Sequence, residues 1–333
     1  MNTTVSFTKN ATNIFFHILT RCNLSCRHCY INPAQHGRDA LPYETIENWL
    51  GTFISNGKET NVVFLGGEPS LHPDLSRCIK KARALGYRSV TVDTNGYLFN
   101  DILAKVSPRE VDYFSFSLDG ATEKTNDRIR GKGSYKQCLY GIGQAVSKGF
   151  KTSLIYTVSC TNIDELEDMP LLLNGLGIDR FFIQVIGIRG KAAGRPPEKM
   201  QVDREEWLRI VPAVARTAAD RGITATYPKV YLSLDEPFEC AGQVADNYFI
   251  FPNGRVYRCP LCEDFPVHSL VFEKDRLMPT GKINECDLFR LNIPEGCVMN
   301  KLIQPDNLSY DKSNSSLYKI ACCLLKEEIR PKS

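Results

Sequence analysis

Apolar residues in the first 186 positions come in short runs separated by longer amphipathic stretches. Runs of four to seven residues bounded by Gly, Pro and Asn are typical of buried strands. The longer stretches repeat their apolar residues with the period of a helix. Six strands are therefore predicted, at Asn13–Leu19, Val62–Leu65, Ser89–Asp93, Tyr113–Leu118, Thr152–Val158 and Arg180–Ile186.

Helix boundaries fall between these strands. Pro42 and Pro73 stand near the start of two helical stretches, and Gly86 and Gly149 follow the ends of two. Strands that alternate with helices through short links form parallel sheets with right-handed crossovers. The predicted fold class is α/β. An open doubly wound sheet and a partial or full barrel both satisfy the pattern.

The pattern changes after Ile186. A single helix is predicted at Asp203–Arg221, with Asp203 as its N-cap. Further on, Asn247–Phe251 and Arg255–Arg258 flank an Asn-Gly turn, which predicts a β-hairpin. We therefore expect a main domain at 1–225 and a small Cys-rich, hairpin-containing domain at 226–333.

Composition is that of an ordinary globular protein: 43% of the 333 residues are apolar, 24% are charged, and the formal charge is +3. This charge gives no indication of nucleic acid or membrane binding. The first ten residues lack a signal-peptide pattern, and no apolar run reaches the roughly 20 residues that span a bilayer. A cytoplasmic location is expected, where the 13 cysteines would be metal ligands, reactive thiols or core residues rather than disulfides.

Three cysteines follow the first predicted strand directly: Cys22, Cys26 and Cys29. Three thiolates at this spacing can surround one metal centre, but four ligands fill a tetrahedral zinc site or a cubane iron–sulfur cluster. With His28 as the fourth ligand, a Cys₃His zinc site is one interpretation.

Polar and glycine-rich segments follow most of the other strands. In parallel α/β folds the carboxyl ends of the strands meet at one rim, where ligands bind. Paired glycines let a backbone approach a ligand closely, and a carboxylate beside them accepts from an ammonium. These segments are Gly66-Gly67-Glu68-Pro69, Thr94-Asn95-Gly96, Ser117-Leu118-Asp119-Gly120, Ser159-Cys160-Thr161-Asn162 and the passage from Gln184 to Gly187.

The cysteine triplet, Gly66-Gly67-Glu68-Pro69 and Ser117-Leu118-Asp119, in this order, resemble the radical S-adenosylmethionine (SAM) superfamily. The resemblance covers roughly residues 14–186. It implies a partial (β/α)6 TIM-like barrel of parallel strands. It also implies that the three cysteines hold three irons of a [4Fe-4S] cluster, while the amino and carboxylate groups of SAM chelate the fourth.

The resemblance also implies roles for the rim residues. Gly66, Gly67 and Glu68 would receive the methionine ammonium, Ser117 and Asp119 would lie near the ribose, and Arg128 or Arg130 would meet the carboxylate. His28 stands where the family usually has an aromatic residue near adenine. The candidate cofactor-binding residues are Gly66, Gly67, Glu68, Pro69, Asn95, Ser117, Asp119, Arg128, Arg130, Gln184 and His28.

Alternatives exist for several of these residues. Arg128, Arg130 and Lys132 together could form a solvated basic loop, and Gln184 could be an interior residue satisfied by backbone. Cys160, on the rim, is a candidate hydrogen-atom donor to the substrate.

The cysteine-rich tail resembles the start of SPASM and twitch domains, which hold auxiliary clusters. Cys240, Gly254 and Cys259 have the matching spacing, whereas the later cysteines depart from the SPASM pattern. Seven thiols are one too few for two fully cysteine-ligated clusters, so one auxiliary [4Fe-4S] cluster is predicted. Its candidate ligands are Cys240, Cys259, Cys297, one of Cys322 and Cys323, and next Cys262; a zinc site is the alternative.

The resemblance implies an oxygen-sensitive enzyme that cleaves SAM reductively to a 5′-deoxyadenosyl radical, with an electron from a donor such as flavodoxin or ferredoxin. The expected substrates are peptides or natural products that undergo epimerisation, crosslinking or oxidation. Sugars, aminocyclitols and nucleotides are alternative substrates. A non-catalytic zinc or iron–sulfur scaffold is the alternative from another functional class.

Overall fold

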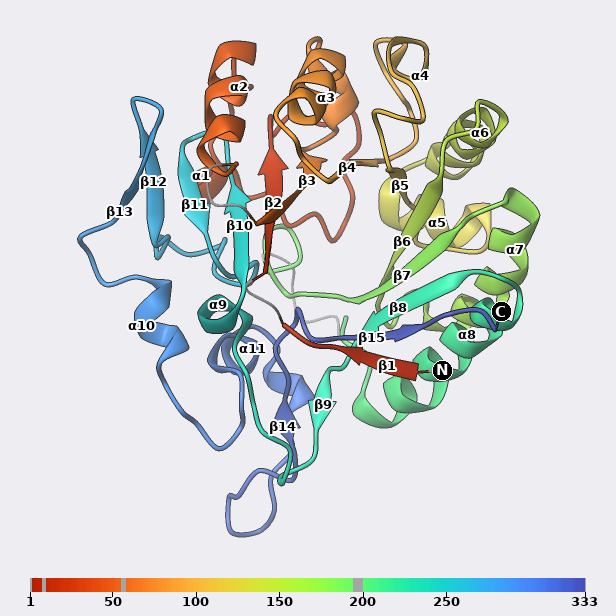
Figure 1. Cartoon of the computed structure of the whole chain (residues 1–333). Helices are drawn as coiled ribbons and strands as arrows, with labels where there is room; N and C mark the ends of the chain where they lie inside the picture. Colours follow the sequence, from red (N-terminus) through yellow and green to blue (C-terminus); the bar gives the residue numbers. More distant parts are fainter. Residues whose placement is uncertain (1, 8–9, 55–57, 194–199, 333) are drawn as a thin grey trace.

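The computed structural model of the protein describes residues 2–7, 10–54, 58–193 and 200–332. Its main feature is a single sheet of thirteen strands, curved around an open interior (Figure 1). Among the described residues no helix combines the length and apolar character needed to cross a membrane.

The six predicted strands are confirmed, each within three residues of its expected bounds. Each pairs in parallel with the next along the chain, which confirms the mostly parallel α/β class. They are β2 (Ala11–His17), β3 (Glu59–Leu65), β4 (Ser89–Thr94), β5 (Tyr113–Ser117), β6 (Thr152–Val158) and β7 (Arg180–Val185).

Two further parallel strands extend this group. β8 (Thr224–Pro228) pairs with β7, and β10 (Asp246–Ile250) pairs with β2. The strand order is linear from β10 to β8, so the sheet forms a partial barrel, as in the TIM-like fold that was expected.

Antiparallel strands continue the sheet at both edges. β15 (Lys326–Ile329) and then β1 (Asn2–Val5) lie beyond β8. β11 (Arg255–Tyr257), β12 (Leu270–Glu273) and β13 (Arg276–Pro279) lie beyond β10. The predicted hairpin is thus confirmed as β10–β11, with Gly254 at a φ of 83° in its turn.

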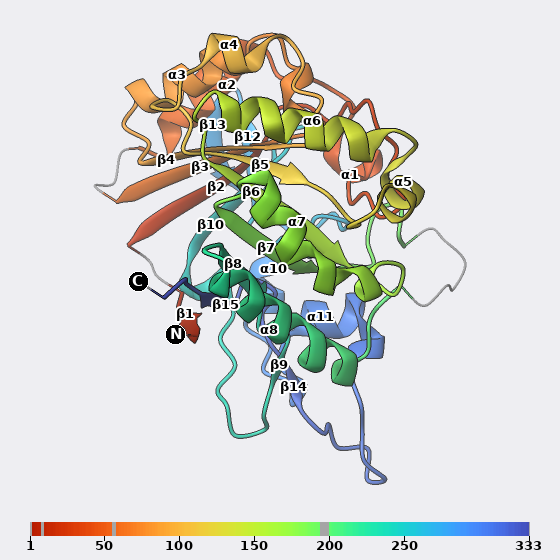
Figure 2. The same ribbon diagram turned by 90° about the vertical axis from the view of Figure 1, so that its right-hand side faces the viewer.

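The helices of the barrel cover its outer face (Figure 2). α8 begins where the Asp203 side chain accepts from the Glu206 N–H, and α6 ends before Gly149, which has a φ of 79°. The larger helices are α2 (Tyr43–Thr52), α3 (Leu75–Ala84), α5 (Glu123–Arg130), α6 (Ser134–Ser147), α7 (Met169–Leu176) and α8 (Arg204–Asp220).

Shorter elements complete the chain. They connect the barrel strands or build the tail below the barrel opening. They are α1 (Pro33–His36), η1 (Pro69–Leu71), α4 (Ile102–Lys105), η2 (Ile163–Asp168), β9 (Tyr231–Leu232), α9 (Ala241–Val244), α10 (Glu285–Phe289), α11 (Val298–Ile303), η3 (Pro305–Asn307) and β14 (Lys319–Ile320).

Strand alternation divides the apolar core from the barrel interior. On β2, Phe16 is fully buried and stacks with Trp49 of α2, outside the sheet. Its neighbours Phe15 and His17 point to the other face and line the interior cavity. The same strand therefore supplies both packing and the wall of the site.

The tail is joined to the barrel through the sheet. The predicted boundary between residues 225 and 226 falls inside β8, and β10 and β15, both from the tail, are hydrogen-bonded to barrel strands β2 and β8. The division into domains at 1–225 and 226–333 stays a prediction.

Candidate functional site

The interior of the partial barrel holds a cavity of about 1730 Å³, a volume that includes its open mouth. Every strand from β2 to β8 contributes to its lining, together with β10 and β15. The cavity is therefore open to solvent and lined by the carboxyl ends of the barrel strands, where ligands bind in parallel α/β folds.

The three cysteines that follow β2 all line this cavity. The Leu24 N–H lies 3.4 Å from the Cys22 sulfur, and the Cys26 sulfur lies 3.9 Å from the Arg130 carbonyl oxygen. Burial raises the pKa of Cys22 to about 11 and also raises the pKa of Cys26. Both thiols are therefore protonated at neutral pH, and binding of a metal centre would release their protons.

The three thiols line one cavity wall in a way that is compatible with an iron–sulfur cluster. Among the described residues, no group of three His, Cys, Asp or Glu side chains is placed to hold a single metal ion. In a cubane cluster each thiolate binds a different iron, so the thiols must surround the cluster rather than meet at one point. His28, the fourth ligand of a Cys₃His zinc site, is instead paired with Asp119.

The paired glycines after β3 let the cysteine-bearing loop pack closely. The Gly67 and Glu68 N–H groups donate to the carbonyl oxygens of Leu19 and Arg21, each at 3.0 Å. A Cβ at Gly67 would lie 2.2 Å from the Arg21 oxygen, which no side chain allows. The sequence predicted that these glycines let the backbone approach a ligand closely. Both glycines line the cavity, but the atoms nearest to them belong to the cysteine-bearing loop.

Glu68 joins the ends of β3 and β4. Its buried carboxylate accepts from Ser70 Oγ at 2.6 Å, Thr94 Oγ1 at 2.9 Å and the Asn95 N–H at 2.7 Å. Burial raises the pKa of Glu68. The Asn95 side-chain amide donates to Asn23 Oδ1 at 2.8 Å, so the rim residues hold the cysteine loop as well as facing the cavity.

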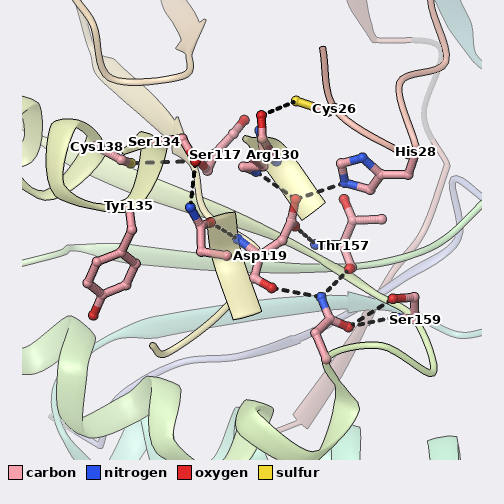
Figure 3. A network of polar contacts seen from close by, with 12 residues as sticks. Cys26, His28, Ser117, Asp119, Arg130, Ser134, Tyr135, Cys138, Thr157 and Ser159 are labelled. Carbon is pink, nitrogen blue, oxygen red and sulfur yellow. Dashed lines mark hydrogen bonds and ion pairs between the residues drawn. The ribbon is translucent and has the colours of Figure 1, made fainter. Parts of the chain in front are cut away.

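Asp119 lies at the centre of a buried ionic network (Figure 3). Its carboxylate lies 2.6 Å from Nε of Arg130 and 2.8 Å from Nε2 of His28, and it accepts the Thr157 N–H at 2.8 Å. Burial opposes its ionisation, but Arg130 and then His28 lower the pKa of Asp119 to about 2. Asp119 therefore carries a full charge at neutral pH.

This network gives Asp119 a positioning role in addition to the predicted one. The side chain is fully buried and is absent from the cavity lining, whereas its partners His28 and Arg130 line it. The expected position of Asp119 near the ribose stays a prediction. Asp119 positions the two residues that face the cavity.

The structure separates the two candidate arginines. Arg130 is buried and lines the cavity, while Arg128 is exposed and donates to the Thr161 carbonyl at 2.8 Å, away from the cavity lining. The segment is not a basic loop, because both arginines belong to α5. Lys132, just beyond this helix, is exposed.

The remaining predicted rim residues divide in the same way. Ser117 and Gln184 line the cavity. Pro69 begins η1 behind the rim and is buried outside the lining. Cys160 is exposed, lies outside the lining and donates to the Gln201 carbonyl at 2.9 Å, so its expected role as hydrogen-atom donor has no support in the geometry.

Sequence reasoning missed several residues in the interior. His17 Nε2 lies 2.7 Å from the Tyr30 hydroxyl, and the Arg189 guanidinium lies 4.7 Å from the centre of the Tyr30 ring. Arg189 also forms an ion pair with Glu263 of the tail. Together these contacts tie the cysteine loop to the tail, a relationship between distant segments that no local motif signals.

Asp93 was also missed, although the period of β4 places it on the inner face with the cavity. Burial is the main cause that raises its pKa to about 7; the Ser115 hydroxyl opposes the shift and the nearby charge of Glu68 adds to it. Asp93 can therefore exchange a proton near neutral pH.

A second, smaller pocket in the tail is lined by five cysteines among apolar side chains. Burial raises the pKa of Cys240 to about 11 and that of Cys297 to about 12. Cys262 lies outside the lining but its thiol hydrogen-bonds with Cys259. The five cysteines are Cys240, Cys259, Cys297, Cys322 and Cys323, and Cys323 also lines the large cavity.

Comparison with known families identifies the class of domain. Residues 16–173 match the model of the radical SAM superfamily. The chain therefore carries a radical SAM domain, whose cofactors in this superfamily are a [4Fe-4S] cluster and SAM.

Two curated relatives resemble the chain in sequence. A pre-heme d1 synthase of Dinoroseobacter shibae is 32% identical over 54% of this chain and 44% of its own length. An Fe-coproporphyrin III synthase of Methanosarcina barkeri is 27% identical over 68% of this chain and 57% of its own. The chain spans about half the length of these curated relatives.

Solved structures share the fold at low sequence identity. Native anSMEcpe with bound AdoMet has a TM-score of 0.63 at 12% identity, covering 92% of this chain and 93% of that one. SuiB of Streptococcus suis bound to precursor peptide SuiA has a TM-score of 0.62 at 16% identity, covering 89% and 65%.

Proposed function

We propose that this protein reductively cleaves SAM and uses the resulting radical to remove a hydrogen atom from a second molecule in the same cavity. The bound cluster and SAM would supply an electron and the 5′-deoxyadenosyl radical, with the electron coming from a cytoplasmic donor such as flavodoxin or ferredoxin. The observation that carries the proposal is the placement of Cys22, Cys26 and Cys29 on the wall of the large interior cavity, together with the rim residues that follow β3, β4 and β5.

The chain's own residues would bind and orient SAM from two sides. Gly66 and Glu68 lie in the loop that follows β3. There, backbone carbonyl groups and the Glu68 carboxylate can accept hydrogen bonds from the ammonium of SAM. Arg130, fixed by Asp119, lines the same cavity and offers a cation for the carboxylate of SAM. His28 and Asn95 would complete the wall around the cofactor.

We further propose that the tail pocket binds a second iron–sulfur cluster. Four of its cysteines, namely Cys240, Cys259, Cys297 and Cys322, would provide a complete ligand set within an apolar shell. Cys323 is the alternative ligand to Cys322, and Cys262 is the alternative within the hairpin segment. Because Cys323 also faces the large cavity, such a cluster would lie next to the substrate.

The substrate is proposed to be a peptide or another natural product, modified by epimerisation, crosslinking or oxidation. The likeness in fold to SuiB, whose structure holds a precursor peptide, favours this class. The relatives named as synthases of pre-heme d1 and Fe-coproporphyrin III favour a second candidate, a porphyrin-type substrate. Sugars, aminocyclitols and nucleotides remain further alternatives.

Anaerobic reconstitution tests the proposal. The reconstituted protein, incubated with SAM and dithionite, should form 5′-deoxyadenosine and methionine in equal amounts. Cys26→Ala should abolish both products, while Cys286→Ser, which removes a thiol outside both cavities, should retain them. A protein that binds zinc, stays colourless and leaves SAM intact would contradict the proposal and favour the scaffold interpretation.

A further inference from the structure

One cation in the large cavity has no carboxylate partner. Three Lys or Arg side chains line the cavity, all among the described residues: Arg130 pairs with Asp119, Arg189 pairs with Glu263, and Lys326 has no ion pair. Unpaired charges inside proteins cost free energy unless a partner or ligand compensates them. An anionic group that enters the cavity would therefore stabilise the charged form of Lys326.

The fold aims Lys326 into the cavity. Lys326 is the first residue of β15 and lies opposite Pro228 of β8, which also lines the cavity. Its neighbour Glu327 points to the other face of the strand and is held by the Thr4 hydroxyl at 2.6 Å. The direction of the lysine is thus set by strand alternation, and it is not a free surface side chain.

The position of Lys326 separates it from the predicted SAM side. Arg130 follows β5, and three strands, β6, β7 and β8, lie between β5 and β15 in the sheet. Lys326 is instead near Cys323, which belongs to the wall shared with the tail pocket. A group bound by Lys326 would belong to a molecule that lies between SAM and the tail.

The carboxylates of the cavity do not take the place of this missing partner. Glu263 is paired with Arg189, and Glu68 follows β3, which five strands separate from β15 in the sheet. Asp93 forms no ion pair among the described residues, Lys326 included. No carboxylate of the cavity therefore pairs with Lys326, and the nearest ionisable groups are the thiols of Cys322 and Cys323.

We propose that Lys326 is the anion-binding residue of the substrate site, and that the substrate carries a carboxylate or phosphate group that reaches this lysine. This inference rests on the proposed function and deepens it by naming the chemical class of the substrate. Burial lowers the pKa of Lys326, while the nearby Cys323 and Cys322 oppose this shift, so an anionic partner would stabilise the ammonium further.

Competitive acetylation of the anaerobically reconstituted holoenzyme tests the inference. The rate of acetylation by an N-hydroxysuccinimide ester is measured by peptide mass spectrometry at Lys326 and at Lys136, an exposed control lysine on α6. Glutarate and pyrophosphate are the two probes, with chloride at matched ionic strength and SAM present throughout. A several-fold slowing at Lys326 alone is expected, and the more protective probe distinguishes carboxylate from phosphate.

Two results would overturn the inference. If neither probe slows acetylation at Lys326 relative to chloride, no anion binds there. Protection by SAM alone, compared with the holoenzyme without SAM, would assign the ammonium to the cofactor. Formation of 5′-deoxyadenosine by the same wild-type preparation is measured in parallel, because its absence would refute the proposed function itself.

Two variants of Lys326 provide an independent test of anion binding. The better probe should raise the melting temperature of the wild-type holoenzyme, because a ligand that binds only the folded state stabilises it. Lys326→Arg should keep this shift and Lys326→Met, which retains the apolar stem, should lose it. An equal shift in Lys326→Met and wild type would contradict the role of Lys326.

Discussion

Nε of Arg130 lies 2.6 Å from Oδ2 of Asp119, and both side chains are buried. The same carboxylate oxygen lies 2.8 Å from Nε2 of His28, the residue before the third cysteine of the loop. One buried anion thus fixes two side chains that face the cavity, although it does not itself reach the cavity.

Replacing this anion should destabilise the protein. Asp119→Asn leaves the Arg130 guanidinium buried without a counter-charge, and breaking a buried pair in this way costs about 3–5 kcal/mol, less where an amide oxygen can still accept. We expect a loss of about 2–4 kcal/mol in urea unfolding at pH 7. Asp164→Asn, an exposed control, should change stability by less than about 0.5 kcal/mol.

The pH dependence of this difference has a definite sign. The folded-state pKa of Asp119 is lowered to about 2. The carboxylate therefore contributes stability above its unfolded pKa of about 4, and that contribution is lost as the pH falls through about 2. The gap between wild type and Asp119→Asn should narrow across this acid range. A gap that is the same at pH 3 and pH 7 would show that the charge of Asp119 is not its source.

Asp93 should behave in the opposite way. Its folded-state pKa is raised to about 7, so ionised Asp93 costs stability, and this cost grows as the pH rises from about 4 through 7. Asp93→Asn removes the titration. Its stability relative to wild type should rise by about 2 kcal/mol between pH 5 and pH 8, measured by urea unfolding, a value reduced for the partial exposure of the side chain to the cavity. A constant difference would refute the raised pKa.

Gly67 offers a steric test of the cysteine loop. In Gly67→Ala the new methyl group would collide with the Arg21 carbonyl, so the loop must move away from β3. We expect the iron content after reconstitution to fall together with stability. Gly143→Ala is the matched control on α6, where the added Cβ has no neighbour within 4 Å; it should be neutral or stabilising by up to about 1 kcal/mol. Full iron incorporation in Gly67→Ala would show that the close packing is unnecessary.

The tail pocket gives a prediction about iron stoichiometry. Cys297→Ser removes a thiol from the pocket and should lower the iron content from about eight to about four per chain. Cys286 lies outside the pocket, so Cys286→Ser should leave the iron content unchanged. Equal loss in both variants would indicate that the tail needs its cysteines for folding rather than for a cluster.

Local patterns predicted the barrel well. Short apolar runs and their Gly and Pro boundaries predicted six of the seven strands described in the first 186 residues, all except β1, and the Asn-Gly turn predicted the β10–β11 hairpin. The pairing of β10 with β2, more than 200 residues apart, could not be foreseen, because neither strand carries a local signal for its partner. The parallel strand β8 was also missed, although Gly222, at a φ of 86°, separates it from the preceding helix.

The site shows the same division between local and distant information. Sequence spacing predicted that Cys22, Cys26 and Cys29 lie together, and the shared rim of parallel strands placed Glu68 near them. It could not separate Arg128 from Arg130, because only the direction of α5 decides which arginine is buried. Cys160 and Cys323 show the converse: the first was predicted at the rim and lies outside the cavity, while the second comes from the tail and lies in its wall.

The attachment of the tail to both edges of the sheet has a consequence for how substrates enter. β10 and β15 are bonded to barrel strands, so the tail cannot swing away without breaking backbone hydrogen bonds on both sides. A substrate would therefore enter the cavity while the tail stays attached to the barrel. For the same reason we expect the distance between the two groups of cysteines to change little when a substrate binds.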